Sequence, residues 1–249
     1  MLSYHITVVS GLQAIARLAR TSPYVVVVTA PLDKAERVAE RQVKRYPSII
    51  ASHTTRTALR RAGYPAVQLV VMPPTEGEVV MLLMSQTPIE GRETWQHALD
   101  LEAPLVWRHY QLTTTPEGRV TWRLSEATRQ HYRERIARLI TGRGGVRRGP
   151  DGHHRAPYQL PPESAHQQVL KLAEHMRVYP GLSGVRADRV ELAQYSTRVW
   201  KSTHPKHPYP QWPTYPYLPY QQPKTAPLET ITQEVQNAPE EEAADQLEP

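Results

Sequence analysis

The feature that most constrains the fold is the segment 24–30, YVVVVTA, a continuous run of mostly β-branched residues. A run of this kind is typical of a strand that is covered on both faces, because a half-exposed strand alternates apolar and polar residues. Helices are predicted on both sides of it, over 11–21 and from Pro31 onward, since the fixed φ of proline suits an early helical position. A strand between two helices predicts a layered α/β arrangement.

The following residues continue this pattern and add two hairpins. Short strands are predicted over 4–10 and 48–55 and a short helix over 56–63. Turn-forming Pro/Gly segments then separate paired apolar runs, which predicts hairpins over 65–86 and 105–125. We therefore expect an α/β (or α+β) fold, with an N-terminal α/β sandwich that contains a mixed sheet and hairpins.

Composition divides the chain into five regions. A helix with the core spacing, capped by Ser125 and ended by Gly142, closes the first of them. The expected regions are an α/β domain (1–141), a basic Gly/Arg/Pro linker (142–162), an αα-hairpin (163–203), a Pro/Tyr-rich arm resembling polyproline II (204–227) and an acidic disordered tail (228–249).

The arm carries a regular repeat. Prolines at 210, 213, 216 and 219 recur every three residues, which is one turn of a polyproline II helix. The residues just before them form a second edge, which needs a groove to bury it. We expect this edge to dock on the chain's own α/β domain, with a partner protein or stacking on bases as alternatives. The docking edge is Tyr209, Trp212, Tyr215 and Leu218.

Charge favours a polyanionic partner. The net charge is +6, but seven acidic residues and no Lys or Arg follow position 228, so residues 1–228 carry 30 basic and 17 acidic side chains, or +13. Guanidinium groups pair well with phosphates, and we expect DNA or RNA backbone contacts. For the linker 142–162, which we call the Arg/Gly segment, the alternative is a solvated loop or an acidic protein partner. The candidate nucleic-acid-binding residues of the linker are Arg143, Arg147, Arg148 and Arg155. A helical wheel places the other candidates on the basic outer face of the αα-hairpin: Arg186, Arg189, Arg198 and Lys201.

Motifs for catalysis are missing. Without cysteine the chain has no disulfide, zinc–thiolate site or cysteine nucleophile, and it contains neither a glycine-rich phosphate loop nor H-E-x-x-H. His153 and His154 are adjacent and would need a third ligand to hold a metal. We expect no catalytic residue, metal or cofactor. No apolar run is long enough to span a bilayer and no signal peptide is evident, so we expect a cytoplasmic protein with no membrane partner.

Three functions follow from these features. The first is non-catalytic, backbone-directed nucleic-acid binding, for example in a mobile element's replication or transfer or in a nucleoprotein assembly. The second is a structural subunit of a large complex whose arm is buried against other protein subunits. The third is a metal-dependent nuclease that uses His153 and His154. DNA reading by the αα-hairpin as a helix-turn-helix is a variant of the first.

Overall fold

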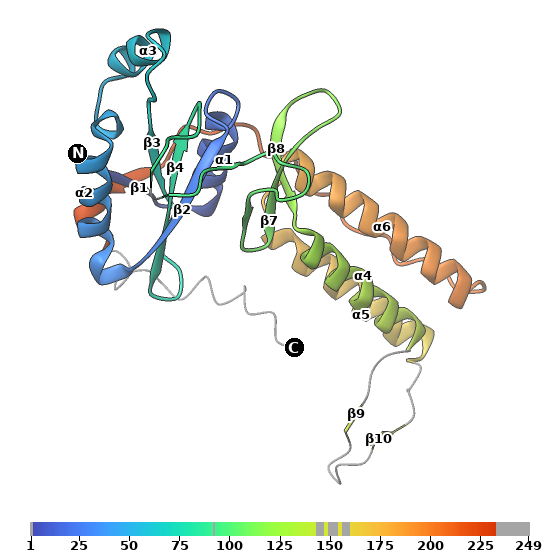
Figure 1. The fold of residues 1–249 in the computed structure, drawn as a ribbon. Helices are drawn as coiled ribbons and strands as arrows, with labels where there is room; N and C mark the ends of the chain where they lie inside the picture. Colours follow the sequence, from blue (N-terminus) through green and yellow to red (C-terminus); the bar gives the residue numbers. More distant parts are fainter. Residues whose placement is uncertain (1, 92, 143–146, 149–153, 156–159, 233–249) are drawn as a thin grey trace. The chain divides into compact units, whose positions relative to one another are not determined.

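The structure is a computed structural model that describes residues 2–91, 93–142, 147–148, 154–155 and 160–232 (Figure 1). It divides into two compact units, each assembled from separate stretches of the chain. The first unit comprises residues 1–105, 112–121 and 220–249, and the second comprises 106–111 and 122–219. The combination of helices and strands that we expected is confirmed.

The sheet of the first unit has four strands in the order β3-β4-β2-β5. Its strands are β2 (Tyr24–Pro31), β3 (Gln68–Val71), β4 (Glu78–Ser85) and β5 (Gln96–His97). All these pairs are antiparallel, and β2 and β4 pair along eight residues from Tyr24↔Ser85 to Pro31↔Glu78. The described part of the sheet is thus antiparallel rather than mixed. The reason is that the predicted 65–86 hairpin forms and its second strand, β4, inserts beside β2.

The β-branched run is only partly covered. Val25 and Val26 are buried and point to opposite faces, as a doubly covered strand requires, but Val27 is 45% exposed. One face packs on α2 (Ala35–Arg45), where Ala35 and Ala39 share a core cluster with Ala30 and Val79 of the sheet. The predicted coverage therefore holds at the start of β2 and is lost at its middle.

Two predicted strands shrink or disappear because capping residues begin helices earlier. The strand expected over 4–10 is reduced to β1 (Ser3–His5), since the Thr7 side chain accepts a hydrogen bond from Ser10 N and starts α1 (Val8–Leu18). The strand expected over 48–55 is absent. That segment holds a short 3₁₀ turn, Pro47–Ile49, and the start of α3 (His53–Arg61), whose N-cap is Ser52.

The end of the arm returns to the first unit as a strand. Residues Thr225–Pro227 form β11, which pairs antiparallel with β1, with Tyr4 opposite Ala226. Ser10 Oγ accepts a hydrogen bond from Lys224 N (2.9 Å) and lies 2.7 Å from His5 Nδ1. A 3₁₀ turn, Leu228–Thr230, follows, and Leu228 and Ile231 join the core cluster beside α2.

The second predicted hairpin forms a three-stranded sheet, in the order β6-β7-β8. Its strands are β6 (Val106–Trp107), β7 (Tyr110–Thr114) and β8 (Val120–Leu124), and β6 pairs antiparallel with β7. The division between the units falls within β7 and β8, so that Tyr110 and Trp122 belong to the second unit.

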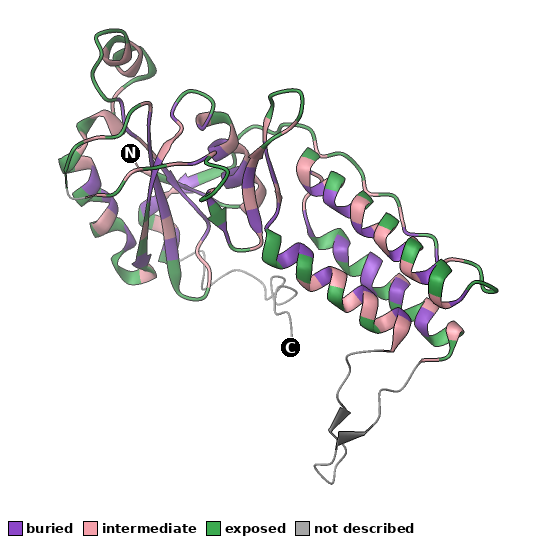
Figure 2. Cartoon of the chain, turned by 45° about the vertical axis from the view of Figure 1, so that its right-hand side comes forward, coloured by how far each residue is buried: buried purple, intermediate pink, exposed green. Residues whose placement is uncertain are grey.

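The second unit is built on α4 (Glu126–Thr141), α5 (Pro162–His175) and α6 (Ser183–Thr203), with a 3₁₀ turn, Met176–Val178, after α5. The caps of α4 are those expected: the Ser125 side chain accepts from Thr128 N, and Gly142 adopts a left-handed conformation with φ 67°. The helix α4 packs on both α5 and α6, and buried positions recur along each of them (Figure 2). The expected αα-hairpin is therefore part of a three-helix arrangement.

Candidate nucleic-acid interface

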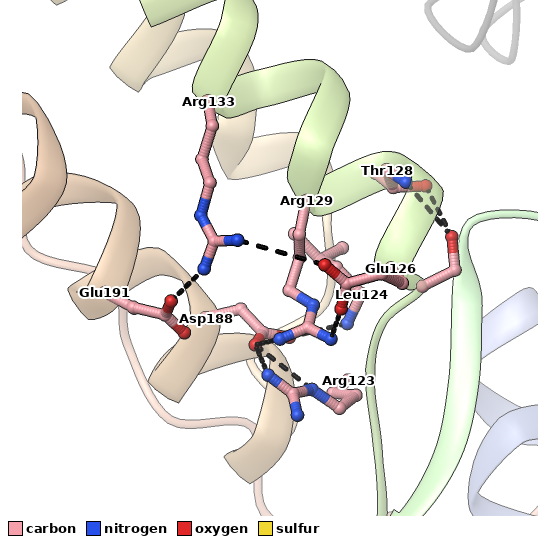
Figure 3. A network of polar contacts seen from close by, with 9 residues as sticks. Arg123, Leu124, Glu126, Thr128, Arg129, Arg133, Asp188 and Glu191 are labelled. Atoms are coloured by element: carbon pink, nitrogen blue, oxygen red, sulfur yellow. Dashed lines mark hydrogen bonds and ion pairs between the residues drawn. The ribbon is translucent and has the colours of Figure 1, made fainter. Parts of the chain in front are cut away.

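A buried carboxylate joins α6 to the strand that precedes α4 (Figure 3). Asp188 is 1% exposed and accepts hydrogen bonds from Arg123 Nη2 (2.7 Å), Arg123 Nε (3.2 Å) and Leu124 N (2.7 Å). Burial raises the pKa of Asp188, and Arg123 acts in the opposite direction. These contacts hold the first turns of α6 against the end of β8.

The same network occupies two of the arginines of α4. Arg129 pairs with Glu126, and Arg133 pairs with Glu191 of α6 (Figure 3). Both guanidinium groups are thus neutralised within the unit. The dense run of arginine in 129–155 therefore contributes fewer free charges than the sequence alone suggests.

The docking edge of the arm lies on the helices of its own unit. The Tyr209 hydroxyl donates to the Ala193 carbonyl of α6 (3.1 Å), and the Tyr215 hydroxyl donates to the Ala173 carbonyl of α5 (2.7 Å). Trp212 is 9% exposed, and Leu218 N donates to Gly181 O (2.9 Å). We had expected this edge on the α/β domain; instead α5, α6 and the turn between them hold it.

The arm also covers part of the expected basic face of α6. Arg189 is buried: it donates to the Tyr179 carbonyl, and its guanidinium carbon lies 4.5 Å from the Tyr215 ring centroid. Arg186 Nε donates to Tyr215 O (3.3 Å). The expectation of an outer basic surface is therefore wrong at Arg189, because the arm packs over the side of α6 that a helical wheel leaves to solvent.

The other two candidates on α6 remain accessible. Arg198 and Lys201 are exposed in its last two turns. His204, which follows α6, is buried there, with Nε2 2.9 Å from Ile140 O of α4. The C-terminal ends of α4 and α6 therefore lie together.

The start of α5 lies beside the C-terminal end of α6. The His166 ring of α5 lies edge-on to the Trp200 ring of α6, with ring centroids 5.9 Å apart, and His207 Nδ1 lies 3.9 Å from Glu163 Oε1. We call the described residues of this region, 138–142, 160–163 and 197–208, the distal end of the second unit. In the sequence, these residues and the linker between them, 138–163 and 197–208, contain eight Lys and Arg residues and two acidic residues. Of the eight, Arg138, Arg198, Lys201 and Lys206 are exposed.

The Arg/Gly segment starts and finishes at the distal end, because Gly142 ends α4 and Pro162 begins α5. Arg143 lies outside the described residues. Arg147 and Arg148 form β9, which pairs antiparallel with β10 (His154–Arg155), so that the backbone of Arg147 is opposite that of Arg155. The sequence offered no strand signal for this pair.

The structure thus brings Arg198 and Lys201 to the end of the unit at which the Arg/Gly segment begins and ends, whereas Arg186 and Arg189 contact the arm. Arg143 and the side chains of Arg147, Arg148 and Arg155 lie outside the described structure. Arg138 and Lys206 also lie at the distal end and were not predicted from the sequence. Their positions, in the last turn of α4 and just after α6, could have indicated it.

Two other features are missing from the described part of the chain. No group of three or more His, Asp or Glu side chains that could hold a metal occurs among the described residues. The predicted candidates, His153 and the side chain of His154, lie outside them. None of the described helices is long and apolar enough to cross a membrane.

Comparison with known proteins returns no relative. No protein-family model, no curated protein and no solved structure matches this chain significantly.

Proposed function

We propose that this protein is a non-catalytic nucleic-acid-binding protein that contacts the sugar–phosphate backbone through the distal end of its second unit. One observation carries the proposal: the ends of three helices pack together and bring the exposed cations Arg138, Arg198, Lys201 and Lys206 to the place where the Arg/Gly segment begins and ends. Cations clustered on one surface replace the counterions of a polyanion, which is the main source of non-specific affinity for nucleic acid.

The type of contact follows from the residues present. The four described cations, Arg138, Arg198, Lys201 and Lys206, are exposed, and none of them has a carboxylate partner among the described ion pairs. Arginine and lysine side chains at a surface bind phosphate oxygens, which are the same for every base. The proposed binding is therefore independent of sequence and weakens strongly as salt rises.

Base reading by α6 as a recognition helix has less support. A recognition helix must present exposed side chains near its N-terminus to base edges. The arm covers this part of α6, where Arg189 is buried and Arg186 donates to Tyr215 O.

The structural-subunit hypothesis has less support, because the aromatic edge of the arm packs on its own unit. It required the aromatic edge of the arm to be free for neighbouring subunits. Tyr209, Trp212 and Tyr215 contact or lie against α5 and α6 of the same unit.

The proposal is tested by filter binding of the full chain to duplex DNA, single-stranded DNA and RNA, from about 50 to about 300 mM salt. The variant replaces the four exposed distal cations with glutamine: R138Q, R198Q, K201Q and K206Q. The control removes four exposed arginines of the first unit: R20Q, R37Q, R41Q and R119Q.

Both variants lose four positive charges, so a general effect of net charge weakens both equally. We expect the distal variant to lose at least about tenfold in affinity and its salt slope to fall by up to about 3 to 4 for duplex DNA, since each phosphate contact contributes about 0.9. The control should change far less. Equal losses in both variants, or a wild type whose binding does not depend on salt, would refute the proposal.

A further inference from the structure

A groove runs between α6 and the arm, and none of the four exposed distal cations lines it. It has a volume of about 600 Å³ and is bounded by one side of α6 between Ser183 and Thr197 and by the arm between Trp212 and Tyr215. The side chains along it include two arginines, a tryptophan and the amide Gln194. No carboxylate lines the groove in the described part of the chain.

The first unusual feature of the groove is a buried arginine without an acidic partner. Arg189 is 2% exposed, and the titratable side chains that act on it are three neutral tyrosines and another arginine, Arg186. Tyr179 O accepts one of its N–H groups and the Tyr215 ring covers one face of the guanidinium, but Nε has no hydrogen-bond partner among the described residues. A buried guanidinium with an unsatisfied donor is unfavourable unless an acceptor, ideally an anion, completes it.

The second feature lies on the opposite wall. The Trp212 ring is buried, and its Nε1, which can only donate, also has no hydrogen-bond partner in the described structure. Arg186 adds a second guanidinium to the groove, with a single N–H used by Tyr215 O. Residues on both walls of the groove therefore carry an unpaired hydrogen-bond donor, and α6 supplies two positive charges.

We propose that this groove is an oxyanion-binding site for a phosphate group, held by the side chains of Arg186 and Arg189 and by the indole N–H of Trp212. A phosphate group presents several strong acceptors and negative charge, which match the planar fork of arginine and a neutral donor beside it. The proposal uses different residues from the distal end, so it does not depend on the proposed nucleic-acid function.

The test follows the indole N–H signal of Trp212 by NMR while inorganic phosphate is added to the full chain at constant ionic strength. The signal is assigned by its loss in W212F, which keeps a ring of similar shape and removes the donor. We expect a saturable shift with phosphate and none when chloride replaces it. Trp95 provides the matched control, because its Nε1 is also buried and unpaired but lies in the first unit. Its signal should not move.

Two variants tie the shift to the proposed ligands. R189K keeps the charge and removes the fork, and R186Q changes the less buried arginine in case R189K does not fold. Each folded variant should bind phosphate at least tenfold more weakly. An unsaturable shift, an equal response to chloride, or unchanged phosphate affinity in the folded variants would overturn the proposal.

A further arm of the experiment identifies the source of the phosphate. A short thymidine oligonucleotide that moves the Trp212 signal at lower concentration than inorganic phosphate would assign the groove to a backbone phosphate, and a response to inorganic phosphate alone would assign it to a free phosphate. The distal variant of the preceding section separates the two proposals, because it should keep its response to inorganic phosphate while losing affinity for nucleic acid.

Discussion

At the scale of single residues, Gly181 determines whether the arm can lie where it does. It sits in the turn between α5 and α6, and a Cβ at this position would lie 2.2 Å from Pro216 O and 2.9 Å from Leu218 N. Both are backbone atoms of the arm and cannot rotate away. In the sequence Gly181 indicates only a turn between two helices, whereas the structure shows that its missing side chain makes room for the backbone of the arm.

Replacing Gly181 with alanine should therefore displace the arm. We expect G181A to lower the free energy of unfolding by about 1–3 kcal/mol, the usual cost of an overpacked contact. Limited proteolysis should cut faster within residues 208–219 than in the wild type. An arm that is equally protected in G181A would contradict the close approach.

We expect His5 to make the stability of the first unit depend on pH. Burial, and secondarily the positive charge of Arg17, lower the pKa of His5 from its ordinary value of 6.5. Below pH 6.5 the unfolded chain then binds more protons at this residue than the folded chain does. The contribution of His5 is thus present above this pH and is lost as the pH falls through the lower pKa of the folded state.

We expect H5Q to reduce the loss of stability on acidification, because a side chain that does not titrate replaces one whose protonation opposes folding. The measurement is the free energy of unfolding in urea from about pH 7.5 down to about pH 5. H53Q, at an exposed histidine of α3, is the control and should retain the wild-type slope. Parallel curves for H5Q and the wild type would count against this account.

At the scale of elements, the arm shows which features a local sequence pattern predicts and which it does not. The proline repeat and the aromatic edge were evident from a period of three, because polyproline II geometry depends on local residues alone. Where the edge docks was not evident, since the complementary surface exists only after α5 and α6 have packed. For the same reason Arg189 was predicted to be exposed. A helical wheel describes one helix by itself and does not include the arm that packs over it.

Trp212 is a large aromatic residue of the arm that is buried, with 9% of its surface exposed. We expect W212A to destabilise the protein by about 3 kcal/mol, the cost of truncating a large buried aromatic side chain. Y217A removes another aromatic residue of the same arm, but Tyr217 is 57% exposed, so its loss should cost less than about 1 kcal/mol. Chemical denaturation of both variants checks the difference, and equal effects would mean that the arm is not anchored through Trp212.

At the scale of the whole molecule, charge is unevenly distributed along the chain. Residues 233–249, which lie outside the described structure, contain six acidic residues and no Lys or Arg, so a chain that ends at residue 232 has a net charge of +12 instead of +6. Such a change alters the long-range field that a polyanion encounters.

Under the proposed function, deletion of residues 233–249 should raise nucleic-acid affinity several-fold at about 50 mM salt. The gain should vanish near 500 mM, where the screening length is about 4 Å. A full-length chain with the six acidic residues changed to glutamine separates charge from length. It should behave as the deletion does, and wild-type behaviour of this chain would show that the charge of the tail is irrelevant to binding.

The sequence by itself determined the features that depend on near neighbours. It predicted the β2 strand, both hairpins, the caps of α4, the α5–α6 pair and the arm, because turn residues, caps and periodic patterns act over a few positions. It failed at 48–55, where the local capping contact of Ser52 outweighed a short β-branched pattern.

Only the tertiary structure decided which charges are free and where they gather. Helix packing joined the ends of α4 and α6 to the start of α5 and so collected the distal cations, while ion pairs removed Arg129 and Arg133 and the arm covered Arg189. The physical reason is that burial and ion pairing depend on contacts between residues far apart in the chain. Charge can be counted in a sequence, but its exposure is a property of the packed molecule.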